Sequence, residues 1–360
     1  MIGGRLSVIQ LAERAARAHP VQARMTLVLG DVTIAVSSND VGLMEGLTGY
    51  FTGFVGSNEI KAEIEILALE GPLPRLEAEF SLHPPEPGKT GIKEEYLDWP
   101  DGRLVRKRLT GMLFAFGGGI NLAMGPCRAN DNQVVNFINN RLIQWELDRG
   151  ALLAHAAAVS LGDSGLAVTG FSGKGKSTLA LHLMSRGLFF VSNDRLLLRP
   201  DRTIRGVPKL PRINPGTALN NPDLREVIPE DEREQFNGLA ERAIWELEHK
   251  YDVRIDRCFG PDRFKLTSGL GGLVILNWRR EDTSPAMNRV DLTDRPDLLN
   301  AVMKQPGLFY QAGGRANDFS EGAYLRRLKD VPTYEITGGV DFGKASDACL
   351  TELDKIKSQR

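Results

Sequence analysis

Cysteine is scarce in this sequence, which has only Cys127, Cys258 and Cys349 among its 360 residues. The three lie far apart and form no CxxC pair, so they fit neither a disulfide framework nor a zinc site. Such sparing use of cysteine is typical of a protein of the reducing cytoplasm. We therefore predict a cytoplasmic location.

An excess of either charge is also absent. The sequence has 45 basic and 46 acidic residues, a formal net charge of -1, so no global field draws it toward nucleic acid or an anionic membrane surface. No stretch approaches the roughly twenty apolar residues that a membrane helix needs, and the first thirty residues lack the continuous apolar region of a signal peptide. We expect no nucleic-acid partner and no membrane partner, and any affinity for phosphate must be local.

What the chain does have is enough apolar sequence, 42% of its residues, for one large domain or two ordinary ones. The first part reads mainly as short strands, and a hairpin is expected to turn at Asp101-Gly102. The strands are predicted at residues 26–29, 32–36, 63–69 and 103–109. We predict a β-rich (α+β) N-terminal domain of unknown role over residues 1–130.

The remainder, residues 131–360, is predicted to be a second domain of the α/β class. Apolar residues at helical spacing predict that it opens with a helix over residues 132–147. A strand at 166–169, a glycine loop, a helix at 177–186 and a strand at 188–192 then follow in the order of a phosphate-binding crossover. Later elements are predicted as strands at 272–278 and 331–337 and a closing helix at 341–356.

The glycine loop, Gly170-Phe-Ser-Gly-Lys-Gly-Lys176-Ser177, meets the GxxxxGK[ST] pattern. Glycines let backbone N–H groups face phosphate oxygens, Lys176 would reach the β- and γ-phosphates, and the Ser177 hydroxyl would ligate Mg²⁺. Ordinary residue usage gives this pattern by chance in about two of a hundred chains of this length. The alternative is a glycine-rich strand-to-helix turn. The residues expected to bind the nucleotide are Gly170, Ser172, Gly173, Lys174, Gly175, Lys176, Ser177 and Thr178.

Two further positions are candidates for the chemistry. Asn193-Asp194 follows a predicted strand, at the edge of an open α/β sheet where ligands collect, so Asp194 is a candidate Mg²⁺ partner. The alternative for this dipeptide is an ordinary turn. His155 lies in an apolar run on the strand expected to neighbour the glycine loop, and it is either a site residue or a hydrogen-bonded core histidine.

A proline-rich stretch over residues 200–230 is predicted to be a long loop that displays Lys209 and Arg212. A guanidinium suits bidentate contact with phosphate, so these side chains could hold a γ-phosphate or an anionic acceptor. The alternative is that they are solvated loop charges.

The segments Ala154-His155-Ala156, Gly170 to Ser177 and Phe189-Phe-Val-Ser-Asn-Asp194 together resemble the core of the HPr kinase/phosphorylase family, in order and spacing, over about fifty residues. The final Val331-Pro-Thr-Tyr-Glu-Ile336 strand is similar as well, and the match is closest to the HprK-related kinase group. The resemblance implies a P-loop kinase domain with a fold shared with phosphoenolpyruvate carboxykinases. It also implies that Lys176 acts on the transferred phosphoryl group, that Ser177 and Asp194 hold Mg²⁺, and that His155 takes the place of the active-site histidine.

The chain departs from the family pattern at Asn193, where the family has the acidic residue that handles the acceptor hydroxyl. A carboxamide can orient a hydroxyl but cannot take its proton, so His155 or Asp194 would compensate, or transfer would proceed without a strong base. The glycine-rich signature that follows the acidic pair in the family is not visible either, so HPr itself is not the expected acceptor.

The sequence thus predicts an ATP- and Mg²⁺-dependent kinase with an unidentified small-molecule or protein hydroxyl acceptor, and with Lys176, His155, Asp194, Asn193 and Arg212 as its catalytic group. A homo-oligomer is compatible with a fold whose relatives often assemble. The alternative is a nucleotide-binding sensor or regulatory ATPase without a phosphoacceptor. A third reading, an enzyme of pyrophosphate or nucleoside phosphates, stays open because no residue visibly reads adenine.

Overall fold

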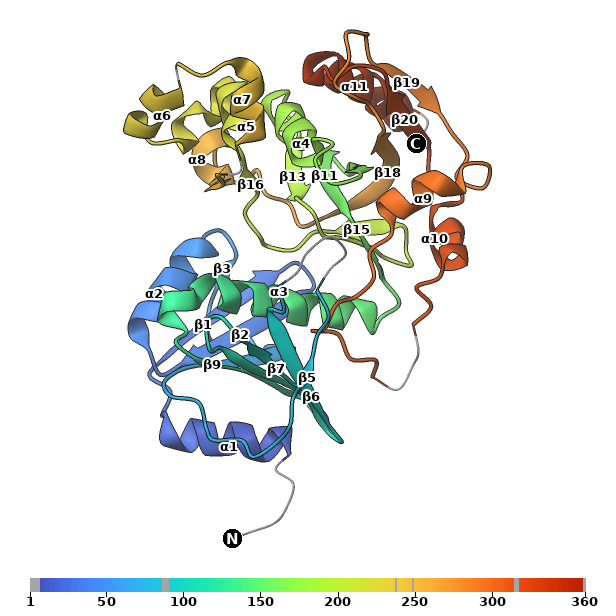
Figure 1. Ribbon diagram of the computed structural model, residues 1–360. Coiled ribbons are helices and arrows are strands. Elements are labelled where there is room, and N and C mark those ends of the chain that lie inside the picture. The colour runs from blue at the N-terminus through green and yellow to red at the C-terminus, as the bar shows by residue number, and fades with distance from the viewer. Residues whose placement is uncertain (1–6, 86–90, 237, 248, 314–316, 359–360) are drawn as a thin grey trace. The chain divides into compact units, whose positions relative to one another are not determined.

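The computed structural model describes residues 7–85, 91–236, 238–247, 249–313 and 317–358 (Figure 1). The chain divides into two compact units, and each contains two stretches of sequence. Unit 1 comprises Met1–Asp148 and Pro306–Ala316, and unit 2 comprises Arg149–Gln305 and Asn317–Arg360. Both are mixed α/β units built on large sheets, which confirms the predicted α/β class.

Unit 1 is built on a nine-stranded sheet with the order β3-β1-β2-β4-β9-β8-β7-β6-β5 among the described residues. The predicted hairpin at Asp101-Gly102 is present, with Trp99 paired to Gly102. The strands are β1 Ala23–Leu29, β2 Val32–Ser38, β3 Val55–Gly56, β4 Ile64–Glu70, β5 Ser81–Leu82, β6 Glu94–Trp99, β7 Gly102–Lys107, β8 Leu113–Gly117 and β9 Ile120–Gly125. The helices are α1 Val8–Ala18, α2 Val41–Tyr50, the short 3₁₀ helix η1 Arg128–Asn130, and α3 Asp131–Leu147.

Helices cover both faces of this sheet, because alternate residues of a strand point to opposite sides. Leu113 and Ala115 of β8 pack in one cluster with the apolar face of α1. Phe114 and Phe116, the residues between and after them, meet the ring of Phe137 on α3.

The division between the two compact units differs from the predicted boundary between residues 130 and 131, because α3 belongs to unit 1 and the division follows Asp148. The apolar spacing did indicate a helix, but it does not show which sheet the helix covers. α3 contacts β4 and β9 of the first sheet as well as α2, and its Phe137 ring meets Phe114 of β8. A helix that seals the first core therefore cannot open the second unit.

A second correction concerns residues 306–311, which lie far along the chain but pack within unit 1; we call this segment the strap. The Phe309 ring lies 5.4 Å from Phe114 and 5.8 Å from Phe116, between ring centroids. The buried guanidinium of Arg141 donates to the Phe309 carbonyl, and Arg103 donates to the carbonyls of Leu308 and Tyr310. The strap is therefore held by both its ring and its backbone.

Unit 2 is built on a sheet with the path β10-β14-β15-β18-β12-β11-β13, extended at β18 by β20 and then β19. Its strands are β10 Leu152–Ala154, β11 Ala156–Leu161, β12 Ser164–Gly170, β13 Phe189–Ser192, β14 Leu196–Leu198, β15 Thr203–Arg205, β18 Thr267–Leu276, β19 Ala286–Arg289 and β20 Thr333–Thr337. The central strands β12, β18 and β20 are parallel to one another, and β11 runs antiparallel to both β12 and β13. The predicted strands on either side of the glycine loop are present in this sheet.

Helices also cover both faces of the second sheet (Figure 1). The four helices are α4 Lys176–Ser185, α9 Pro296–Val302, α10 Glu321–Leu328 and α11 Phe342–Ser358. Val168 of β12 packs with α4 and α11, whereas its neighbour Ala167 packs with α9 and α10. This alternation makes β12 a fully buried strand, so the loop that follows it starts from a fixed position.

The stretch predicted to be one long loop, residues 200–230, contains short regular elements instead. After β15 come β16 Arg212–Ile213, α5 Pro215–Leu219 and the 3₁₀ helix η2 Pro222–Val227. The prolines at the first turns of α5 and η2 do not prevent helix formation, because the first N–H groups of a helix have no partner inside it. Next along the chain are α6 Glu230–Phe236, α7 Glu241–Glu246, β17 Tyr251–Asp252 and α8 Ile255–Phe259.

No helix in the described part of the chain is long and apolar enough to cross a membrane.

Candidate functional site

The glycine loop leaves the carboxyl end of β12 and enters α4 at Lys176. Gly170, Gly173 and Gly175 have φ angles of 151°, 77° and 86°, which side-chain-bearing residues rarely adopt. A Cβ on Gly170 would lie 2.8 Å from the Leu276 carbonyl oxygen, and one on Gly175 would lie 2.8 Å from the Phe342 ring. A Cβ on Gly173 would have no atom within 4 Å. Two glycines therefore allow close packing, and the third borders open space.

Trp278 holds the middle of the loop. Its indole N–H donates to the Lys174 carbonyl at 2.8 Å, and the Lys174 ammonium donates to the Trp278 carbonyl at 2.9 Å. Trp278 is almost completely buried and meets the Phe342 ring edge to face. Phe342 also lies against Gly175. Lys174 and Gly175, at the end of the loop, therefore both contact the pair of rings formed by Trp278 and Phe342.

Lys176 is buried at the start of α4, and its ammonium donates to the carbonyls of Gly170 at 2.7 Å and Phe171 at 3.3 Å. The pKa of Lys176 is lowered to about 8, mainly by burial; Asp194 opposes this shift and the nearby Lys304 adds to it. The cation is thus held across the beginning of the loop, in the electrostatic field of two other side chains.

His155 lies beside the same part of the loop. The sequence predicted it inside a strand, but in the structure it lies outside one. It occupies the break between β10, which pairs with β14, and β11, which pairs with β12. Its N–H donates to the Val302 carbonyl at 2.8 Å, so its backbone bonds outside the sheet. Since Ala156 pairs with Thr169, His155 sits level with Gly170.

The side chain of His155 is uncharged at neutral pH. Burial lowers its pKa to about 4, the cations Lys176 and Lys304 lower it as well, and Asp194 acts in the opposite direction. A neutral imidazole has one nitrogen that accepts a hydrogen bond.

Asn193 and Asp194 follow β13 directly. Because β12 and β13 are both antiparallel to β11, their carboxyl ends meet at the same edge of the sheet, where the loop begins. The side-chain oxygen Oδ1 of Asn193 is buried and has no hydrogen-bond partner among the described residues. Asp194 acts on the charges of Lys176 and His155 from this edge.

The remaining predicted residues differ in their surroundings. Ser172 is exposed in the loop and Ser177 is half-buried in the first turn of α4. The hydroxyl of Thr178 is buried and hydrogen-bonded to that of Thr217 on α5 at 2.8 Å.

Lys209 lies near Asp194, and burial lowers the pKa of Lys209. Arg212 pairs with Asp252 at 3.1 Å on the exposed β16–β17 ribbon.

Sequence reasoning missed Lys304 and Trp278. Lys304 lies 128 positions beyond Lys176 and belongs to no motif, so only the pairing of distant segments brings it near the loop. Trp278 was the last residue of the predicted strand 272–278 and lies just after β18, which ends at Leu276; a buried aromatic residue at that point was the available signal.

No group of three or more His, Cys, Asp or Glu side chains that could hold a metal ion occurs in the described residues. A Mg²⁺ ion here would need oxygen ligands from a bound nucleotide and from water as well as from the protein, which is its usual mode of binding beside phosphates.

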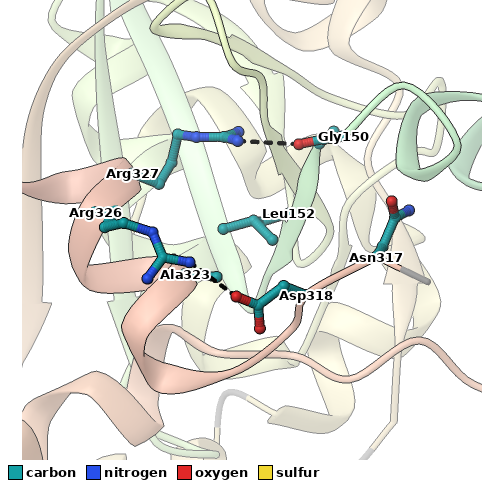
Figure 2. Close-up of a pocket in the computed structure, with 8 residues that line it drawn as sticks. Gly150, Leu152, Asn317, Asp318, Ala323, Arg326 and Arg327 are labelled. Atoms are coloured by element: carbon teal, nitrogen blue, oxygen red, sulfur yellow. Dashed lines mark hydrogen bonds and ion pairs between the residues drawn. The ribbon is translucent and has the colours of Figure 1, made fainter. Parts of the chain in front are cut away.

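A separate hollow of about 220 Å³ lies at the other end of β10 (Figure 2). Its lining includes Gly150, Leu152, Asp318, Arg326 and Arg327. Arg327 donates to the Gly150 carbonyl at 3.0 Å and Arg326 pairs with Asp318 at 2.8 Å, so these charged groups are already partnered. Its lining contains none of the site residues predicted from the sequence.

No protein-family model matches the chain, and no curated protein matches it in sequence. Among solved structures, it is similar to the Hpr(Ser) kinase/phosphatase from Coxiella burnetii. The alignment covers 57% of this chain and 91% of that one, with 11% sequence identity and a TM-score of 0.28. This structural likeness is weak.

Proposed function

We propose that this protein is a Mg-ATP-dependent kinase that transfers the γ-phosphoryl group to a hydroxyl of a small molecule or of a serine-bearing protein. The observation that carries the proposal is the convergence of Lys176, His155 and Asp194 at the start of the glycine loop. They come from the loop itself and from the ends of two other strands of the sheet.

Several features of the loop support binding of a nucleoside triphosphate. The space beside Gly173 is open, so phosphate oxygens can approach the backbone there, and α4 begins at the end of the loop with the positive end of its dipole. Lys176 would exchange its two carbonyl partners for the β- and γ-phosphates. Ser177 and Asp194 would hold Mg²⁺, which supplies neutralisation of phosphate charge when it is bound.

Phosphoryl transfer asks the protein mainly for position and charge neutralisation, because its transition state is loose. Neutral His155 would accept a hydrogen bond from the acceptor hydroxyl, and the unpartnered Asn193 oxygen would help to orient the same group. Arg212 would have to leave Asp252 to contribute, so we give it a lesser part.

A second candidate, a nucleotide-binding sensor or regulatory ATPase, is favoured by Asn193. A carboxamide cannot take up a proton, and its position after β13 is where an acceptor-activating carboxylate would stand. Such a protein would bind ATP in the same loop but would have no acceptor.

Calorimetric titration of Mg-ATP into the wild type, Lys176→Ala and the surface control Lys355→Ala tests the binding step. We expect wild type and control to bind alike and Lys176→Ala to lose at least tenfold in affinity, since it removes a charged phosphate contact. Parallel titrations with Mg-GTP and Mg-pyrophosphate identify the donor.

Label transfer from γ-labelled ATP to fractions of a cell extract tests the chemistry. Label on an extract component with wild type and control, but not with Lys176→Ala, supports the kinase. Binding without transfer supports the sensor, and absence of binding in the wild type refutes both.

A further inference from the structure

We propose that Lys304 is a second phosphate-binding lysine of the glycine-loop site, which contacts the terminal phosphate of the nucleotide and makes the site prefer a triphosphate to a diphosphate. This inference rests on the proposed nucleotide binding. It adds a residue from outside the loop and assigns the selection of the nucleotide's terminal phosphate to it.

The backbone fixes Lys304 beside His155. Met303, the first residue after α9, forms an isolated antiparallel bridge with Ala154 at the end of β10, and the two hydrogen bonds that flank this bridge make a short ladder. The His155 N–H donates to the Val302 carbonyl at 2.8 Å, and the Lys304 N–H donates to the Leu153 carbonyl at 3.1 Å. The position of Lys304 is therefore set by the strand that leads to the site.

The same ladder decides which way the side chain points. Residues opposite each other in an antiparallel pair lie on one side, and successive residues alternate. Lys304 lies opposite Leu153 in this register, and Leu153 and His155 are two residues apart on one member. Lys304 and His155 therefore share a side as diagonal neighbours, roughly 7–8 Å apart, with their Cβ atoms somewhat closer.

Tyr324 of α10 stabilises the pairing of Leu153 with Lys304. Its fully buried hydroxyl contacts the Leu153 carbonyl at 2.5 Å and the Lys304 carbonyl at 3.2 Å, one on each member of the ladder. A lysine on a braced backbone loses less conformational entropy when it binds an anion than one on an open loop.

The electrostatics are those of a site for a polyanion. Lys304 lowers the pKa of His155, which the register places beside it, so the charge of Lys304 acts at the beginning of the loop. Lys176 and Lys304 both act on the one imidazole of His155, and an anion that contacts both ammonium groups would offset their mutual repulsion.

The terminal phosphate is the part of the nucleotide that such a lysine would reach. Lys304 is placed beside His155, level with Gly170, where the loop begins. The α-phosphate end of a nucleotide lies toward the helix N-terminus at the far end of the loop, and the loop lysine reaches the β- and γ-phosphates. A cation at the beginning of the loop, where β12 ends, therefore faces the terminal phosphate.

The test is the ratio of affinities for Mg-ATP and Mg-ADP, measured by calorimetry on the full chain. We expect Lys304→Gln to weaken Mg-ATP binding by about tenfold or more and Mg-ADP binding by less than about threefold, because only the triphosphate has the group that Lys304 contacts. Lys304→Arg keeps the charge and should keep most of the preference. The exposed Lys329→Gln is the matched control and should leave both affinities unchanged.

The outcomes separate cleanly. An unchanged ratio in Lys304→Gln overturns the inference, and so does an equal loss of ATP and ADP affinity, which would mean that Lys304 supports the loop as a whole. If the wild type binds neither nucleotide, the proposed function itself fails, and the inference falls with it.

Discussion

Two glycines of the same loop should respond to alanine in different ways, because their surroundings differ. At Gly173 the added Cβ meets nothing within 4 Å, so the cost to folding is the left-handed backbone alone, about 1–2 kcal/mol. The methyl group would nevertheless occupy the open space through which phosphate oxygens reach the loop. We expect Gly173→Ala to weaken Mg-ATP binding by at least tenfold with only this modest loss of stability.

At Gly175 the Cβ would also collide with two ring atoms of Phe342 at 2.8 Å. That ring is stacked on His182 and meets Trp278 edge to face, so it has little room to move. Overpacking of this kind costs about 1–3 kcal/mol beyond the backbone strain. Gly175→Ala should therefore lower the free energy of unfolding by roughly 2–5 kcal/mol in total.

Urea unfolding and nucleotide titration of both variants check this reasoning. Because the chain has two units, unfolding is followed with two probes, so that the transition of unit 2 is separated from that of unit 1. The reasoning is refuted if Gly173→Ala binds Mg-ATP as tightly as the wild type while Lys176→Ala does not, since phosphate would then approach from another side. Equal destabilisation by the two alanines would refute the steric part.

Other predictions follow from burial. Phe309→Ala should lower the free energy of unfolding of unit 1 by roughly 2–3 kcal/mol in urea. This is less than the loss expected for a fully buried ring, because Phe309 is only partly buried. A loss under about 0.5 kcal/mol would contradict the account of the strap. His155 has a folded pKa of about 4 against 6.5 when unfolded, so the unfolded chain gains its proton first and stability falls as pH drops from 6.5 toward 4. His155→Gln should therefore lose less melting temperature than the wild type between these pH values, and an equal loss would count against the buried neutral imidazole. Burial raises the pKa of Cys127, Cys258 and Cys349 to about 12, 11 and 12, so a thiol reagent at pH 8 should label the native protein slowly and the unfolded protein fast; rapid native labelling would show that the thiols are accessible.

The parts of the site that the sequence indicated are those with local signals. The glycines and the apolar runs beside them predicted the strand, loop and helix around Lys176, and these elements are present. The strand order could be guessed for His155 because β11 and β12 are consecutive and form a hairpin. Lys304 had no such signal, because its place depends on a ladder between residues about 150 positions apart.

The division into units differs from the predicted boundary for a related reason. Periodicity identifies a helix and its apolar face, but α3 could have covered either sheet, and only the aromatic residues of β8 and the strap decide that it seals the first. No local pattern marks residues 306–311 as part of unit 1. Their carbonyls are bound by Arg103 and Arg141, which lie more than 150 positions earlier.

The strap has a consequence for how this protein can be divided. A fragment that starts at Arg149 would carry Phe309 without the rings that surround it, and a fragment that ends at Asp148 would leave Arg141 buried without the carbonyl it binds. No single cut in the gene therefore yields two intact halves. Recombination that exchanged only the N-terminal unit would have to supply the matching strap as well, so the two units are expected to be inherited as one piece.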